Sequence, residues 1–157
     1  MLKNDKPSIR FSSDFIIGYP EETEKDFTQT LLILKKIKFI NSYSFIFSPR
    51  PGTPAAKMKL LDPIIAKKRL LKFQLEANSI KKNYREKLIG SIVNVLFENR
   101  LRNEEAFFGR DEYNNSVIVK SNKDLIGKTI KVKINEYNQN TLFGEFFLDY
   151  DTKNFAA

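Results

Sequence analysis

The chain has 157 residues, of which 41% are apolar, and it carries a net charge of +8. The apolar fraction and the 14 phenylalanines are sufficient for a packed core, which excludes a wholly disordered chain. Cysteine and histidine are both absent, which excludes disulfides, thiolate-held iron–sulfur clusters, imidazole-ligated zinc and catalysis by either side chain within these residues.

The first predicted element is a strand within residues 12–20. Three consecutive apolar residues, Phe15 to Ile17, stand between polar residues and a stop at Gly18 and Pro20. This pattern is typical of a parallel strand that is covered on both faces.

A helix of about four turns follows. Thr23 and Asp26 have the spacing of a capping box, with Asp in the place of Glu. The apolar residues after them recur at helical intervals: Phe27, Leu31, Leu34 and Ile37.

A second β-rich run, residues 43–47, is closed by the proline-rich segment 48–54. Strand, helix and strand predict one βαβ unit. Two parallel strands with one helix would leave both sheet edges unpaired, so we expect the missing strands to come from elsewhere.

A long basic helix is predicted from Ala66 onward. Its apolar positions alternate gaps of four and three residues: Ala66, Leu70, Phe73, Ala77, Ile80 and Tyr84. Residues 57–87 hold ten basic side chains against three acidic ones, whereas residues 88–157 have a net charge of −1. Such a helix can follow RNA phosphates, although a solvated face is the commoner explanation of its charge.

From Leu88 the period of the pattern changes towards two, and Val93 and Val95 are among the alternating residues. Further β-rich runs, separated by turn residues, lie at 106–108, 117–119, 129–134 and 142–148. Several short antiparallel strands in so few residues predict a small closed barrel of the OB-like kind, beginning near residue 87.

Two pairs of segments carry a resemblance to a known family. Residues 13–23 (SDFIIGYPEET) and 43–56 (YSFIFSPRPGTPAA) resemble the late barrel of radical S-adenosylmethionine methylthiotransferases. Residues 109–117 (GRDEYNNSV) and 127–132 (GKTIKV) resemble the TRAM domain that ends those enzymes and grips tRNA. The resemblance extends from about residue 2 to 147. Its proline-rich stretch is closest to the tRNA-modifying branches, and we favour the branch that methylthiolates isopentenyl-adenosine beside the anticodon.

The resemblance implies an α/β partial radical-SAM barrel, a βαβ unit plus a long helix, followed by a small all-β OB-like TRAM barrel. We expect the carboxy-terminal strands and helix of the barrel in 1–60, a basic connecting helix in 61–87, the TRAM domain in 88–150 and a tail in 151–157. One departure is Glu21, which stands where the family usually has Gly in a Gly-Phe-Pro-Gly-Glu-Thr turn.

The larger departure concerns the cysteines. The complete family enzyme uses S-adenosylmethionine and two 4Fe-4S clusters, held by an amino-terminal domain and an early barrel motif that have no counterpart in this sequence. We therefore expect no catalytic residue and no metal ligand here. By resemblance Asp14, Gly18 and Pro20 lie on the S-adenosylmethionine side, with an ordinary strand-end turn as the alternative.

Seven residues are candidates for contact with RNA. Arg50 follows a strand end and offers bidentate donors, although a structural salt bridge is an equal alternative. Phe107 and Phe108 beside Arg110 resemble an aromatic-plus-cation clamp for bases, and we expect at least one of the two rings in the core. The full set is Arg50, Lys68, Arg69, Lys72, Phe108, Arg110 and Lys128.

The resulting hypothesis is a carboxy-terminal fragment of a tRNA methylthiotransferase that supplies tRNA binding and complements a separate chain carrying the cysteine-containing half. The alternatives are a stand-alone RNA-binding TRAM module and an inactive remnant. No apolar run approaches the roughly 18 residues of a membrane span and no signal peptide is present, so we expect a cytoplasmic protein that binds tRNA and no membrane.

Overall fold

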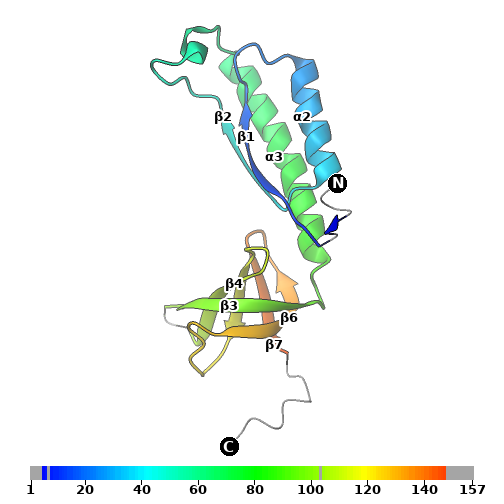
Figure 1. Ribbon diagram of the computed structural model, residues 1–157, viewed down its shortest axis with the longest axis vertical. Helices are drawn as coiled ribbons and strands as arrows, with labels where there is room; N and C mark the ends of the chain where they lie inside the picture. The colour runs from blue at the N-terminus through cyan, green and yellow to red at the C-terminus, as the bar shows by residue number, and fades with distance from the viewer. Residues whose placement is uncertain (1–4, 7, 103, 148–157) are drawn as a thin grey trace, which may run out of the picture. The chain divides into compact units, whose positions relative to one another are not determined.

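The computed structural model describes residues 5–6, 8–102 and 104–147. The chain forms two compact units, Met1–Asn83 and Tyr84–Ala157 (Figure 1), each with its own hydrophobic core. Within the described ranges, no helix is both long and apolar enough to cross a membrane.

The first unit contains a βαβ motif followed by a long helix. Strand β1 (Ser12–Ile17) and strand β2 (Asn41–Ile46) pair in parallel and are joined by helix α2 (Glu24–Ile37). After β2 come a short 3-10 helix, η1 (Pro54–Lys57), and helix α3 (Pro63–Glu86), whose last three residues belong to the second unit. The predicted βαβ unit and long helix are thus confirmed.

Helix α2 begins with the predicted capping box. The Thr23 Oγ1 accepts a hydrogen bond from the Asp26 N–H at 3.2 Å, and the Asp26 carboxylate accepts from the Thr23 N–H at 2.9 Å and from its hydroxyl at 2.6 Å. These donors favour the ionised carboxylate and lower the pKa of Asp26, the hydroxyl contributing most. The helix ends at Lys38, which takes a left-handed conformation with φ 58°.

Both helices cover the same face of the β1–β2 sheet. Phe15 and Ile17 on β1 pack with side chains of α2 and with Phe73 of α3. The other face is open: Ile16, with 52% of its surface exposed, and Phe45, with 55%, lie there side by side. The expectation that this strand is covered on both faces is therefore wrong for the described residues, because a two-stranded sheet with both helices on one side has nothing on the other.

The second unit is a closed five-stranded barrel. Its strands are β3 (Ile92–Arg100), β4 (Ala106–Asp111), β5 (Ser116–Lys120), β6 (Thr129–Tyr137) and β7 (Thr141–Phe146). They are ordered β3-β4-β5-β7-β6, with β6 closing on β3 and only β5 and β7 pairing in parallel within the described barrel. The predicted OB-like all-β module is present.

One predicted limit of the barrel strands differs from the structure. Strand β3 begins later than expected because residues 87–90 form a turn, in which Gly90 has φ 79°. At the other end, Leu148 and the expected tail, 151–157, lie outside the described residues.

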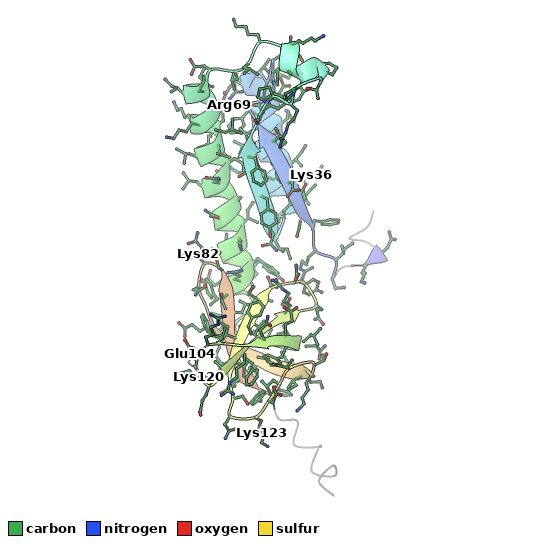
Figure 2. The ribbon with its side chains drawn as sticks, turned by 90° about the vertical axis from the view of Figure 1, so that its left-hand side faces the viewer. Lys36, Arg69, Lys82, Glu104, Lys120 and Lys123 are labelled. Carbon is green, nitrogen blue, oxygen red and sulfur yellow. The ribbon has the colours of Figure 1, made fainter. Side chains whose placement is uncertain are left out.

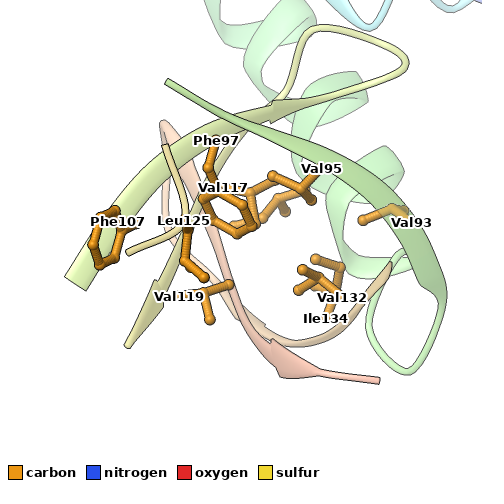
Figure 3. Close-up of a cluster of buried hydrophobic side chains, with 10 residues drawn as sticks. Val93, Val95, Phe97, Phe107, Val117, Val119, Leu125, Val132 and Ile134 are labelled. Carbon is orange, nitrogen blue, oxygen red and sulfur yellow. The ribbon is translucent and has the colours of Figure 1, made fainter. Parts of the chain in front are cut away.

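Alternating side chains of the strands fill the barrel (Figure 3). Val95, Phe97 and Val132 are fully buried in this cluster. Gly109 and Gly144 allow strands to approach closely, since a Cβ at Gly109 would lie 2.4 Å from the Leu96 carbonyl oxygen and one at Gly144 would lie 2.4 Å from that of Lys133. A side chain at either position would therefore force two backbones apart.

Candidate nucleic-acid interface

An aromatic ring and a guanidinium lie together on the outer face of β4. Phe107 points into the core with 2% of its surface exposed, so the expected core position of one of the two rings is confirmed. Phe108 and Arg110 point outward, and the Arg110 guanidinium carbon lies 5.3 Å from the centre of the Phe108 ring. Strands β4 and β5 are the second and third of the barrel, the pair whose face binds oligonucleotides in OB folds.

Arg110 is held in place and remains accessible. Its Nε lies 3.6 Å from a carboxylate oxygen of Glu98, and its Nη1 donates a long hydrogen bond of 3.4 Å to the Asn114 carbonyl. The side chains of Arg110 and Glu98 are 40% and 37% exposed. Ile118 on β5 stands opposite Phe108 and extends the apolar surface. A base could stack on this surface while the guanidinium meets a phosphate.

Further cations lie at the end of the barrel where the Ser121 N–H donates to the Glu105 carbonyl at 2.9 Å. An open hollow of about 520 Å³ is lined there by Arg100, Leu101, Arg102, Glu104 and Glu105. Figure 2 labels Lys120, Lys123 and Glu104 in this unit.

Lys128 is exposed at the same end, although its Nζ donates to the Asp124 carbonyl at 2.8 Å. Sequence reasoning singled out Lys128 but not Arg100, Arg102 or Lys120. The sequence signal that could have identified these three residues is their position at or near the ends of predicted strands.

The three basic candidates on α3 have different environments. Lys68 and Lys72 are exposed. Arg69, labelled in Figure 2, is buried with 7% of its surface exposed. Its Nη1 lies 2.7 Å from the Glu22 carboxylate and 2.9 Å from the Glu22 carbonyl oxygen. Its Nη2 lies 3.1 Å from the Glu24 carboxylate. Because these partners use its terminal nitrogens, Arg69 is better explained as a structural residue than as an RNA contact.

The turn after β1 is organised by the same ion pair. The Gly18 N–H donates to the Glu22 carboxylate at 3.2 Å, and a Cβ at Gly18 would lie 3.1 Å from that of Ala66 on α3. The close packing against α3 and the φ of 74° thus explain why residue 18 is glycine. Pro20, two residues later, is buried. Glu21 adopts φ 67°, a region that favours Gly, the residue usual here in the family.

The other two candidates of the first unit are accessible. Asp14 is exposed on the open face of the sheet, opposite Tyr43 of β2. Arg50 is exposed in the segment after β2, where its carbonyl accepts hydrogen bonds from the Thr53 N–H and hydroxyl. Its guanidinium forms no ion pair in the described part of the chain, so the alternative of a structural salt bridge gains no support.

Arg85 adds to the positive charge of α3 but is not available to RNA. It is 3% exposed and donates to the carbonyls of Asn138 at 2.8 Å and Asn140 at 3.0 Å. Burial lowers the pKa of its guanidinium, and electrostatic interactions with Tyr84 and with the buried Asp111 oppose this shift. Arg85 therefore anchors the turn between β6 and β7.

The residues do not fit an iron–sulfur cluster. The sequence has no cysteine, and among the described residues no three acidic side chains gather as a metal site would require.

Comparison with known proteins agrees with this geometry. Residues 86–147 match the TRAM domain. Over 146 residues the chain is 52% identical to a tRNA-2-methylthio-N(6)-dimethylallyladenosine synthase of Pelagibacter ubique, a match that covers 92% of this chain and 32% of that enzyme. Synthases of the same name from Buchnera aphidicola and Rickettsia bellii are 41% and 40% identical, with 90% and 93% of this chain covered.

The chain matches the carboxy-terminal part of these synthases. The resemblance found in the sequence is therefore confirmed. The chain spans about one third of the length of the curated relatives that it matches.

Proposed function

We propose that the chain is the tRNA-binding part of a tRNA methylthiotransferase that acts on an adenosine carrying a dimethylallyl (isopentenyl) group beside the anticodon. The observation that carries this proposal is the Phe108–Arg110 pair, on the outer face of a barrel that matches the TRAM domain. The accessible cations Arg50, Lys68, Lys72 and Lys128 would add phosphate contacts, in a cytoplasmic protein.

The first unit would be part of a radical-SAM barrel. Its sheet has two strands, so each strand has an unpaired edge, and the face away from the helices exposes large apolar side chains. Further parallel strands at these edges would turn that face into the interior of a barrel. A separate chain with the cysteine-containing half would supply them.

The chemistry would depend on groups that this chain does not hold. In the complete family enzyme, clusters and S-adenosylmethionine supply the radical and sulfur chemistry. No residue here fits a cluster, and we assign no catalytic step to this chain. Of the three residues expected on the S-adenosylmethionine side, Asp14 is the one that presents an accessible side chain.

Binding of an anticodon stem-loop RNA at several salt concentrations tests the RNA-binding proposal. We expect the logarithm of the affinity to fall linearly with that of the salt concentration. Arg110→Ala and Phe108→Ala should each weaken binding about tenfold, and Arg110→Ala should reduce the salt slope by about one. Lys36→Ala, at an exposed site on α2, is the matched control. Absent or salt-independent binding contradicts the proposal.

Co-expression with a cysteine-containing half of a related synthase tests the role in methylthiolation. We expect a complex that contains iron and restores 2-methylthio-adenosine in tRNA, measured by nucleoside mass spectrometry. RNA binding without complex formation would instead favour a stand-alone RNA-binding module. The barrel can serve as such a module because it is closed and needs no further strands.

A further inference from the structure

The side of α3 opposite its buried face carries a row of exposed apolar side chains. Ile64, Leu71 and Leu75 are 78%, 53% and 72% exposed. They are seven and four residues apart, so they lie on one face of the helix, away from the face on which Ala66 and Phe73 are buried. We call these three residues the outer stripe. Single exposed apolar side chains need no explanation, but a row along one helix face is typical of a helix that packs against another element.

Lysines surround the outer stripe. Lys67 and Lys68 lie beside its first half, and Lys82, labelled in Figure 2, follows its last residue by about two turns. Within the part of the chain that the structure describes, none of the three forms an ion pair. Between residues 63 and 82 the sequence has one acidic residue, Glu76, and it is paired with Lys35 at 3.0 Å. The surface is therefore apolar at its centre and positive around it.

Charge and geometry together decide which kind of partner fits this surface. A second copy of the chain would bring the same lysines against these, and like charges across an interface are unfavourable. RNA phosphates would pair with the lysines but would leave the apolar side chains without a partner. A lipid surface takes up a broad apolar face, whereas the opposite face of α3 is buried in the core. A helix with an apolar row and acidic residues beside it satisfies both the outer stripe and the lysines.

We propose that the outer stripe of α3 docks an acidic amphipathic helix of a partner protein. The stripe covers about 16 Å of the helix axis, so the partner helix would have about three turns or more. Its apolar residues would be three and four apart, with Glu or Asp on either side. This interaction goes beyond the proposed RNA binding. Because Lys68 is also one of the proposed phosphate contacts, RNA and the partner would share that side chain, and the apolar residues distinguish the two roles.

A synthetic peptide of about three heptads tests this proposal, with Leu at the a and d positions and Glu at the e and g positions. We expect saturable binding to the whole chain that weakens with salt, measured by isothermal titration calorimetry. Leu71→Gln/Leu75→Gln should weaken binding about tenfold or more, since it removes the central apolar contacts. Glutamine keeps the helix propensity at these exposed sites. Lys67→Gln/Lys68→Gln should weaken binding about fivefold, and a peptide with Lys in place of Glu should not bind.

Ile33→Gln is the matched control. Ile33 is 49% exposed on α2 and lies two residues from Lys35, hence on nearly the opposite side of that helix from the ion pair with α3. This variant should bind the peptide like the parent chain.

Absence of binding to the acidic peptide, or equal binding by Leu71→Gln/Leu75→Gln, would overturn the proposal. It would also be overturned if that variant kept peptide binding and instead lost self-association of the chain, affinity for anticodon stem-loop RNA or affinity for phosphatidylglycerol vesicles. Those results would assign the outer stripe to a second copy, to RNA or to a membrane surface. Failure of the parent chain to bind RNA would contradict the proposed function alone, because peptide binding does not depend on it.

Discussion

Arg69 connects the turn after β1 to the body of α3. The side chains of Arg69 and Glu22 are each 9% exposed, and the Glu22 carboxylate also accepts the Gly18 N–H. A buried ion pair adds little net stability over an apolar replacement, but removal of one partner leaves the other charge buried and unpaired. The integrity of the turn therefore depends on both members.

We predict that Arg69→Met lowers the free energy of unfolding of the first unit by about 3 kcal/mol. Hydrogen exchange of the amides in residues 18–27 of the whole chain measures the effect, which should appear as faster exchange. Lys68→Met, at the exposed neighbour, is the control and should change stability by about 0.5 kcal/mol or less. Equal protection in the two variants would contradict the structural role of Arg69.

The environment of Arg69 could have been predicted from its spacing. Arg69 follows Ala66 by three residues and precedes Phe73 by four, so it lies on the buried face of the helix. Lys68 and Lys72 fall off that face. The net charge of the whole helix does not distinguish the buried Arg69 from its exposed neighbours. Its partner Glu22 lies 47 residues away in sequence, so no local pattern connects the two residues.

At the level of elements, the capping box makes the stability of α2 depend on pH. Since hydrogen bonds lower the pKa of Asp26 below its usual 3.8, its ionised form favours the folded helix. The stabilisation by ionised Asp26 is complete above the pKa that this carboxyl has in the unfolded chain, about 3.8. The stabilisation is lost as the pH falls below this value and through the lower pKa of Asp26 in the folded chain.

We predict that Thr23→Ala raises the pKa of Asp26 towards its usual value, because the hydroxyl is the largest cause of the shift. The helix should also lose about 1 kcal/mol of stability with the cap. NMR titration of the Asp26 carboxyl carbon measures the first effect, with Thr28→Ala, an exposed site later in the same helix, as the control. An unchanged titration of Asp26 in Thr23→Ala would contradict the assignment of the Thr23 hydroxyl as the largest cause of the lowered pKa.

The elements differ in how far their sequence determines them. Thr23, Asp26 and the apolar spacing after them identify α2 because cap and periodicity are local signals. The barrel was predictable from alternation, yet the turn at Gly90 delays β3. Whether the second face of β1 is covered depends on the number of strands in the sheet, and the apolar run of Phe15 to Ile17 does not contain that information.

At the scale of the whole molecule, the two units differ in completeness. The barrel closes on itself, so its strands leave no unpaired edge between first and last. Among its described residues, the α/β unit has two unpaired edges and an open apolar face. The first 87 residues also carry a net charge of +9 against −1 for the remainder. We therefore expect the barrel to be the more stable unit, and the α/β unit to gain most from a partner.

The barrel unit begins before the segment that matches the TRAM domain. The match starts at residue 86, but the Tyr84 hydroxyl accepts a hydrogen bond from Asn115 at 3.2 Å, and Arg85 donates to two carbonyls of the β6–β7 turn. Asn115 in turn donates to the buried carboxylate of Asp111 at 2.8 Å. The last turn of α3 thus completes the base of the barrel.

We predict that Arg85→Met in the whole chain lowers the free energy of unfolding of the barrel by about 2 kcal/mol, because two carbonyls lose a charged donor while the cost of burying the charge is also relieved. Urea unfolding followed by hydrogen exchange of β6 and β7 measures this change, with the exposed Lys87→Met as control. A fragment of residues 84–147 should likewise be more stable than one of residues 86–147 by a similar amount. If the two fragments unfold at the same urea concentration, the contacts of Tyr84 and Arg85 add nothing to the barrel, and its boundary lies at residue 86.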